Sequence, residues 1–323
     1  MLKRWAYTYK KKIGDLYMSI TNFELLEEIK GEFSGFVQTL QDQITELMVK
    51  YDPKIKLTED NWKREDFAGN PGGGGRTRHF RGDIFESAGV NTSTIFGEID
   101  PQFASKLNGD GLDLWASGIS LIIHPLNPHI PTVHANFRFI HQGDRCWFGG
   151  GADLTPFIPR EEDFSYFHGI WKEACFPMGE SAYGEMKKEC DHYFVNHHRG
   201  TEARGIGGIF FDHYLMKNDL NETKNQVMNL ANHFCKSYFP LVEKNRHRTW
   251  TKEEEEFQLF RRGRYVEFNL LHDRGTLFGL KTKGRIDSIL ISLPPRCTFH
   301  YGMPFSKNSW QEKMMGYYAP KNW

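Results

Sequence analysis

The 323-residue chain lacks an excess of charge of either sign. It carries 41 lysines and arginines against 41 aspartates and glutamates, which gives a formal net charge of +0 at pH 7. Proteins that bind nucleic acid or anionic lipid through a charged surface usually carry a basic excess. The balance therefore argues against a nucleic-acid partner and against a role at a charged membrane surface.

Long apolar runs are also missing. No window approaches the roughly 18 uninterrupted apolar residues of a membrane helix, so we expect no integral membrane segment. The first 12 residues are basic but contain Tyr7 and Tyr9 and no apolar stretch, which argues against a secretory signal. No linker, repeat or low-complexity tract divides the chain, so we expect an N-terminal extension over residues 1–20 and a single domain over residues 21–323. A transit peptide is the alternative for the extension.

Cysteine is scarce, and its pattern is informative. The five cysteines are odd in number and form no C-x-x-C pair. This argues against a disulfide scaffold and against a cysteine-ligated zinc, and it favours a reducing compartment. We therefore expect a cytoplasmic protein.

Motifs for nucleotide cofactors are absent. Gly72–Gly75 lacks the spacing of a P-loop, and Gly149–Gly151 lacks the G-x-G-x-x-G spacing. Gly205–Gly208 leads into a strand pattern rather than into a helix. We therefore expect no nucleotide or nicotinamide cofactor, and we expect these glycines to allow close backbone approach to a flat ligand or to other strands.

Hydrophobic periodicity predicts helices separated by groups of short strands. A Thr-Lys-Glu-Glu capping box at 251–254 predicts the start of a helix that ends at 261–263. Short turns at 273–275 and 283–285 predict antiparallel hairpins. The grouping of helices and strands favours an α+β fold with an antiparallel sheet. The other helices are expected near 22–50, 162–176, 181–198 and 222–246, and the strands over 119–124, 132–140, 205–212, 264–272, 277–282 and 288–293.

The run from Pro131 to Phe139 is the most informative for chemistry. Alternate residues of a strand share a face, so His134, Asn136 and Arg138 point one way while apolar residues point the other. One face then carries an acid/base group, an amide and a fixed cation. An ordinary solvent-facing sheet surface is the alternative.

Neighbouring strands extend this polar face. Ser120 and His124 share one side of the strand over 119–124, and the Pro125–Pro131 turn is suited to a hairpin with the next strand. A third strand is expected to place Tyr265, Glu267, Asn269 and Asp273 on one side. Three polar faces in one sheet predict a lined pocket covered by helices.

Arginines near this face suit carboxylates. Arginine forks bind planar carboxylates in a bidentate manner, so Arg138, Arg274 and Arg285 together fit a substrate with several carboxylates. Asp273 among these cations suits a substrate N–H group. A solvated surface arginine is the alternative for each one taken singly.

Histidines offer a second chemistry. His168 lies on an apolar helix stripe and His198 closes the next helix, and with His124 and His134 they could form a divalent-metal site of four imidazoles. No local H-x-x-x-H pair is involved, and a satisfied core histidine is the usual alternative for such positions.

Several long motifs together resemble one family. They are GGGGRTR at 72–78, SGISLIIHPLNPHIPTVHANFRF at 117–139, WFGGGADLTP at 147–156, RGIGGIFFD at 204–212 and RRGRYVEFNLLHDRGTLFGLKT at 261–282. Over about residues 35–300 the chain resembles the oxygen-dependent coproporphyrinogen III oxidases. The resemblance implies a large antiparallel sheet flanked by helices on both faces, working as a homodimer.

The resemblance also implies an activity. It is the oxidative decarboxylation of two propionates of coproporphyrinogen III to vinyl groups, giving protoporphyrinogen IX, CO₂ and H₂O₂ in haem biosynthesis. O₂ is the co-substrate, and no organic cofactor is implied.

Site residues follow from the matching motifs. His134 matches a proton donor, and Asp273 with Arg274 matches a pair implicated in binding or catalysis. Substrate contacts are implied for Ser120, Asn136, Phe137, Arg138, Lys283, Gly284 and Arg285, and divalent-metal ligands for His124, His134, His168 and His198.

Two rival functions remain at this stage. A non-catalytic tetrapyrrole carrier would not need an acid/base group in the pocket. A metal-dependent hydrolase would use the histidines, would hold a stoichiometric metal, and would lose activity in chelator.

Overall fold

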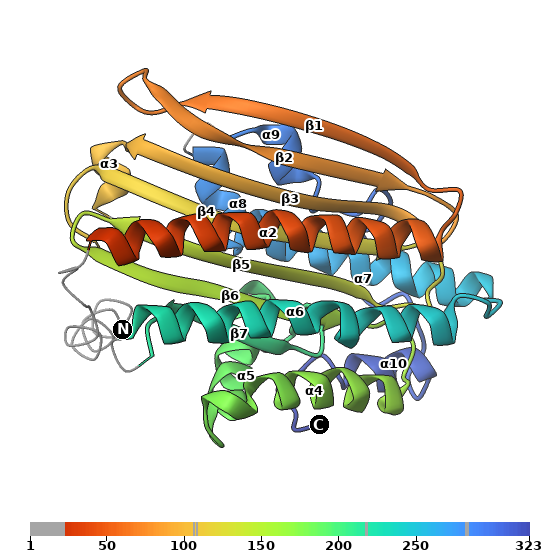
Figure 1. Cartoon of the computed structure of the whole chain (residues 1–323). Helices are drawn as coiled ribbons and strands as arrows, with labels where there is room; N and C mark the ends of the chain where they lie inside the picture. Colours follow the sequence, from red (N-terminus) through yellow and green to blue (C-terminus); the bar gives the residue numbers. More distant parts are fainter. Residues whose placement is uncertain (1–22, 106, 108, 217–218, 282–283) are drawn as a thin grey trace.

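The computed structural model describes residues 23–105, 107, 109–216, 219–281 and 284–323, so the expected extension over residues 1–20 lies outside the described residues. Seven antiparallel strands form one sheet in the order of the sequence, with helices on both faces (Figure 1). This confirms the predicted α+β, single-domain fold. The strands are β1 (Lys56–Glu65), β2 (Pro71–Arg81), β3 (Phe85–Glu98), β4 (Asp113–Pro125), β5 (Thr132–Gln142), β6 (Arg145–Thr155) and β7 (Gly208–Tyr214).

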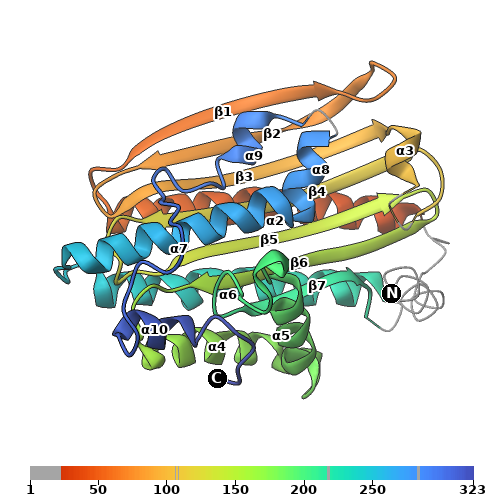
Figure 2. The same ribbon diagram turned by 180° about the vertical axis from the view of Figure 1, so that it is seen from behind.

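Two long helices, α2 (Phe23–Tyr51) and α6 (Leu220–Asn245), cross one face of the sheet (Figure 1). Three others, α7 (Lys252–Leu271), α8 (Arg274–Lys281) and α9 (Ile286–Leu290), cross the opposite face (Figure 2). Among the helices of the described ranges, none is both long enough and apolar enough to cross a membrane. The remaining helices are α3 (Pro101–Ala104), α4 (Glu161–Cys175), η1 (Phe176–Met178), α5 (Ala182–Tyr193), η2 (His197–Arg199) and α10 (Trp310–Met315).

The face under α2 and α6 holds the hydrophobic core. Leu26, Ile29 and Phe33 recur at helical spacing on α2 and are buried, as the periodicity predicted. The Phe33 ring meets Phe139 of β5 and Phe148 of β6, with ring centroids 6.3 and 5.4 Å away. This apolar packing fixes one face of the sheet and leaves the other face for polar groups.

The β4–β5 hairpin is confirmed, and with it the polar face. Ser120 lies directly opposite Asn136 in the register, so both side chains point to the same side. Along β5, His134, Asn136 and Arg138 are half-buried, whereas the residues between them are buried in the core. The alternation in the sequence therefore predicted this face correctly.

The three predicted strands over 264–272, 277–282 and 288–293 are wrong. Within them residues 264–271, 277–281 and 288–290 are helical, and α7 continues to Leu271, past the end predicted at 261–263. A Cβ at Gly263 would collide with the carbonyl oxygen of Thr298, so this glycine allows close packing of a later segment and does not end the helix. The turn at 273–275 is a helix start, because Asp273 accepts a hydrogen bond from the backbone N–H of Thr276.

Four strands, β1, β2, β3 and β6, were not predicted. β2 begins Pro-Gly-Gly-Gly-Gly and has no apolar alternation. A Cβ at Gly74 would collide with the carbonyl oxygen of Trp62 in β1. The glycine run therefore allows two strands to lie close together, one of the two expectations for these glycines.

Candidate active site

A buried ion pair holds the predicted proton donor. The Nδ1 atom of His134 lies 3.0 Å from Oδ1 of Asp153 on the neighbouring strand β6. Arg204 donates to both oxygens of Asp153, at 2.6 and 2.9 Å. Burial raises the pKa of Asp153, but the charge of Arg204 and the hydrogen bond with His134 outweigh it, so the pKa lies below its ordinary value. Asp153 is therefore a carboxylate that orients the imidazole.

Arg204 is itself fixed from several sides. Its guanidinium carbon lies 4.1 Å from the ring centroid of Phe194 and 4.7 Å from that of Tyr265, and one N–H donates to Asn269 Oδ1 at 2.9 Å. Arg204 Nη2 also lies 3.0 Å from His134 Nδ1. Among the described residues, Nε2 of His134 has no hydrogen-bond partner, which leaves that atom available to a substrate proton.

A second cluster joins three elements through Asp212 of β7. Arg138 donates to Oδ1 of Asp212 at 2.7 Å, and Nη2 of Arg274 in α8 lies 3.4 Å from Oδ2. Burial raises the pKa of Asp212, but the charges of Arg138, His213 and Arg274 lower it below its ordinary value. Each arginine therefore uses part of its fork on Asp212 and keeps other N–H groups for a ligand.

Gly149 of β6 makes room for this pair. A Cβ at this position would lie 2.8 Å from Oδ1 of Asp212 and 2.9 Å from Nε of Arg138. The glycine lies opposite Arg138 in the register. Gly149 therefore leaves space for the Arg138–Asp212 ion pair, a role that the sequence did not predict.

Asp273 is held by both of its oxygens. Tyr193 donates its hydroxyl to Oδ1 at 2.9 Å, and Thr276 donates its backbone N–H and its hydroxyl to Oδ2 at 2.7 and 2.8 Å. Burial raises the pKa of Asp273, whereas the Thr276 hydrogen bonds and the charge of Arg204 lower it to a net value below the ordinary one. The carboxylate is charged and fixed at the start of α8.

The residues of the predicted third polar strand lie on helix α7 instead. Tyr265 packs against His124 with ring centroids 5.3 Å apart, and Asn269 contacts Arg204, so both point toward the sheet. Glu267 instead accepts hydrogen bonds from Arg199 and Arg264. One helix face thus replaces the expected strand face, and Glu267 does not belong to it.

The predicted substrate contacts lie in different places. Ser120 is exposed and Asn136 is half-buried on the polar face, and Asn136 accepts from Arg138 at 3.2 Å. The Phe137 side chain is buried in the core on the opposite face, so the structure does not bring it to the site. Arg285 is paired with Asp60 of β1, Gly284 donates its N–H to the Gly279 carbonyl, and Lys283 lies outside the described residues.

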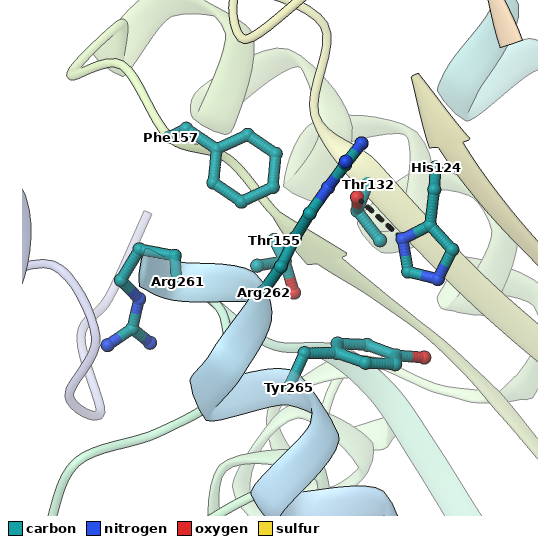
Figure 3. Close-up of a pocket in the computed structure, with 7 residues that line it drawn as sticks. All are labelled: His124, Thr132, Thr155, Phe157, Arg261, Arg262 and Tyr265. Atoms are coloured by element: carbon teal, nitrogen blue, oxygen red, sulfur yellow. Dashed lines mark hydrogen bonds between the residues drawn. The ribbon is translucent and has the colours of Figure 1, made fainter. Parts of the chain in front are cut away.

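A small pocket between α7 and the ends of β4, β5 and β6 contains His124 (Figure 3). The His124 ring contacts the Thr132 hydroxyl at 3.3 Å and the Ser292 carbonyl oxygen at 3.0 Å. Burial, aided by the charge of Arg262, lowers its pKa to about 3. His124 is therefore a neutral residue that ties β4 to the segment after α9. The pocket is lined by His124, Thr132, Thr155, Phe157, Arg261, Arg262 and Tyr265.

The four histidines of the expected metal site have separate surroundings. His168 contacts the Tyr183 hydroxyl at 2.9 Å, and His198 contacts His272 at 2.7 Å and Glu267 at 2.9 Å. Neither shares a partner with His124 or His134. In the part of the chain that the structure describes, no group of three or more His, Cys, Asp or Glu side chains is arranged to hold a metal. The four histidines therefore do not come together as the expected metal site in the described part of the chain.

A larger hollow, of about 410 Å³, lies between α2 and strands β1 to β3. Its lining includes Gln38, Lys63 and Arg76 and none of the predicted site residues. The polar chemistry therefore gathers on the α7–α9 side of the sheet and not in this hollow.

Sequence reasoning missed four residues of the site. Asp153, Arg204 and Asp212 belong to the family-like motifs, but no role was assigned to them. Asp153 could have been found from the β5–β6 pairing, which places it opposite His134. Tyr193 gave no signal, because it contacts Asp273 across 80 positions of sequence.

The fold and the site together define a class of protein. An antiparallel α+β scaffold carries two guanidinium groups, fixed carboxylates and one oriented histidine on one sheet face, as expected of an enzyme that acts on a substrate with carboxylates. The chain belongs to the coproporphyrinogen III oxidase family, since the family model described as "Coproporphyrinogen III oxidase" matches residues 32–323.

Curated relatives agree with the family model. The chain is 42% identical over 313 residues to proteins of Prochlorococcus marinus strains MIT 9301 and MIT 9312. Both are named oxygen-dependent coproporphyrinogen-III oxidase, and each alignment covers 88% of this chain and 90% of the relative.

Proposed function

We propose that this protein is an oxygen-dependent coproporphyrinogen III oxidase of haem biosynthesis. It converts two propionates of coproporphyrinogen III to vinyl groups and yields protoporphyrinogen IX. The match to the family over residues 32–323 carries the proposal, and the oxygen-dependent enzymes among its relatives favour O₂ as the electron acceptor. The geometry supports it with Arg138 and Arg274 on the same sheet face as His134.

The balance of each decarboxylation defines what the protein must do. A propionate loses CO₂ and the equivalent of a hydride to become a vinyl group. O₂ takes the two electrons and, with a second proton from solution, becomes H₂O₂. The protein therefore has to bind carboxylates, hold the reduced macrocycle against O₂ and direct protons.

Carboxylate binding falls to the arginine cluster. Arg138 and Arg274 each form an ion pair with Asp212 and keep further N–H groups for substrate carboxylates. Ser120 and Asn136 lie beside Arg138 on the polar face and supply neutral hydrogen-bonding groups. The resemblance implies that Lys283, Gly284 and Arg285 would bind a further propionate, with Arg285 shared between Asp60 and the substrate. The Asp273 carboxylate would accept hydrogen bonds from pyrrole N–H groups.

Proton transfer falls to His134. Its Nδ1 is held by Asp153, which Arg204 holds in turn, and Nε2 is the ring nitrogen without a hydrogen-bond partner among the described residues. A carboxylate behind an imidazole fixes the ring orientation and the tautomer. Such a histidine can donate or accept the proton that accompanies loss of the hydride equivalent.

The natural assembly is proposed to be a homodimer, as the family resemblance implies. Phe299, Tyr301 and Met303 are large apolar side chains that stay exposed in the single chain. Apolar patches of this kind suit a protein interface. Light scattering on the purified protein should give about twice the 37.7 kDa mass of the chain.

We also propose a cytoplasmic location. All five cysteines are free, and Cys146, Cys175 and Cys190 are buried. Unpaired thiols suit a reducing compartment. Imaging of a tagged full-length chain would test the location.

One assay decides between the oxidase and its rivals. Purified protein is incubated with coproporphyrinogen III in air and under anaerobic conditions, and protoporphyrin fluorescence is read after chemical oxidation of the product. Product that forms only in air supports the oxidase. Binding without product in air would favour a tetrapyrrole carrier, and hydrolysis of test esters that stops in chelator would favour a metal-dependent hydrolase.

A further inference from the structure

Tyr193, the last residue of α5, contacts both members of the Asp273–Arg274 pair. Its hydroxyl donates to Oδ1 of Asp273 at 2.9 Å and accepts the backbone N–H of Arg274 at 3.1 Å. The guanidinium carbon of Arg274 lies 4.8 Å from the centroid of the same ring. One phenol therefore fixes a carboxylate, the adjoining backbone and a guanidinium group.

The ring of Tyr193 is itself held by three aromatic side chains. It stacks on Phe210 of β7 with centroids 4.3 Å apart and an interplanar angle of 8°. It meets Phe194 edge-on at 4.8 Å and Phe268 of α7 at 5.9 Å. Burial raises the pKa of Tyr193 to about 12, so the hydroxyl remains a neutral donor at physiological pH. The phenol is a rigid support for the pair.

The contact to Asp273 is separate from the capping of α8. Thr276 binds Oδ2 of Asp273, whereas Tyr193 binds Oδ1. Removing the Tyr193 hydroxyl therefore leaves the Asp273–Thr276 cap in place but releases one carboxylate oxygen and the backbone N–H of Arg274. The melting comparison below shows whether this freed N–H at the start of α8 costs stability.

We propose that Tyr193 is a positioning residue that sets the orientation and the acidity of the Asp273 carboxylate and the place of the Arg274 guanidinium. The inference rests on the proposed function, because the pair matters only if it serves the reaction. A constellation of groups has to be held within about 0.5 Å of its productive geometry, and a rigid aromatic support provides this. This role would explain why the hydroxyl of Tyr193, at the end of α5, contacts Asp273 and Arg274 at the start of α8.

The charged and titratable groups around Asp273 define how its acidity should respond. Arg204 and His134 favour its charged form, and the Tyr193 hydroxyl adds a hydrogen bond to that form. Loss of that hydrogen bond should raise the Asp273 pKa. The groups that face Asp273 are Arg138, His134, Tyr193, Arg204, Tyr265, Arg274 and Thr276.

The test replaces Tyr193 by Phe in the full-length chain. The ring stacking and the contact with the Arg274 guanidinium remain, and the hydroxyl is lost with its hydrogen bonds to Asp273 and to the Arg274 backbone. Tyr238→Phe is the matched control, since Tyr238 is a buried phenol in α6 whose hydroxyl donates to the Pro131 carbonyl at 3.1 Å. The expected result is a fall in kcat of about tenfold or more for Tyr193→Phe, with melting close to that of the control.

A second readout does not depend on substrate. Carboxyl NMR of aspartate-labelled protein, with the Asp273 signal identified by its loss in Asp273→Asn, gives the titration of that group directly. Tyr193→Phe should move this titration upward by about half a pH unit or more. Tyr193→Leu, which also removes the ring beneath Arg274, should in addition raise KM.

The outcomes separate this inference from the proposed function. An Asp273 titration that does not move overturns the positioning role, whatever the activity. A titration that moves while kcat stays at the wild-type value also overturns it. If the wild-type chain gives no product in air, the proposed function fails, and the titration alone then decides whether Tyr193 holds the Asp273 carboxylate.

Discussion

Arg138 and Asp212 join strands β5 and β7 across β6, through a hydrogen bond of 2.7 Å between Nη2 and Oδ1. The pair lies on the polar sheet face, and Arg138 keeps 35% of its side chain exposed while Asp212 keeps 16%. The partly exposed Arg138 is thus oriented by a half-buried carboxylate before any substrate binds. Preorganisation of this kind lowers the cost of binding.

We expect Arg138→Ala to weaken substrate binding. A hydrogen bond to a charged group contributes about 1.5–3 kcal/mol, or about 10- to 150-fold in affinity. The measurement is the KM for coproporphyrinogen III together with direct binding under anaerobic conditions. Melting of the variant must show an intact fold, and an affinity within twofold of wild type would contradict the assignment of Arg138 to a carboxylate.

Asp212 should make stability depend on pH in the acid range. Its folded-state pKa lies below the ordinary value of about 3.9, so its stabilising contribution is complete above that pH and is lost as the pH falls through the folded-state pKa. The difference in unfolding free energy between wild type and Asp212→Asn should therefore be constant from about pH 7 to 5 and should shrink below about pH 4.

The neighbouring imidazole has to be controlled in that experiment. The Nε2 atom of His213 lies 3.8 Å from Oδ2 of Asp212. The backbone φ of His213 is 53°. Asparagine tolerates this left-handed conformation, so the comparison is repeated in a His213→Asn background. A difference that stays flat down to pH 3 in both backgrounds would contradict the ion-pair interpretation.

Asp153→Asn should destabilise the fold strongly. The change leaves Arg204 as a buried cation without its carboxylate, and breaking a buried pair in this way costs about 3–5 kcal/mol. Chemical denaturation measures the loss. The matched control is Glu173→Gln, which breaks an exposed pair with Lys236 and should cost no more than about 1 kcal/mol. Equal losses of unfolding free energy in the two variants would show that the Arg204–Asp153 pair is not shielded from water.

Asp273→Asn should stop turnover while the fold stays intact. Asparagine caps a helix about as well as aspartate, so α8 should keep its start, but the negative charge is gone. We expect kcat to fall by about 100-fold or more, as for loss of an electrostatic group in an active site. Melting and kcat are measured side by side, and unchanged turnover would remove Asp273 from the mechanism.

The strand over Thr132–Gln142 and the segment over 264–272 show what a sequence can and cannot predict. In β5 the alternation extends over many residues and starts directly after a Pro-rich turn, and both the strand and its polar face were predicted correctly. In 264–272 a short alternating run also fits a helix, because Tyr265, Phe268 and Asn269 recur at helical spacing. The continuation of the helix from Thr251 decides the conformation, and no local pattern carries that information.

The site was predictable as far as it lies on single strands. His134, Asn136 and Arg138 follow from alternation within β5, and the arginines indicated carboxylates. Asp153 and Tyr193 reach the site through pairing with β6 and through the packing of α5 against α8, which depend on the whole fold. Phe137, which the resemblance implied as a substrate contact, is a core residue, as the alternation along β5 already indicated.

The bare position at Gly149 limits how members of this family can diverge. Even one methyl group there would overlap the Arg138–Asp212 bridge, since it would lie within 3 Å of both partners. Because both partners are the ends of flexible side chains, a chain with a side chain at this place should show either a displaced arginine–aspartate pair or a replacement of one partner.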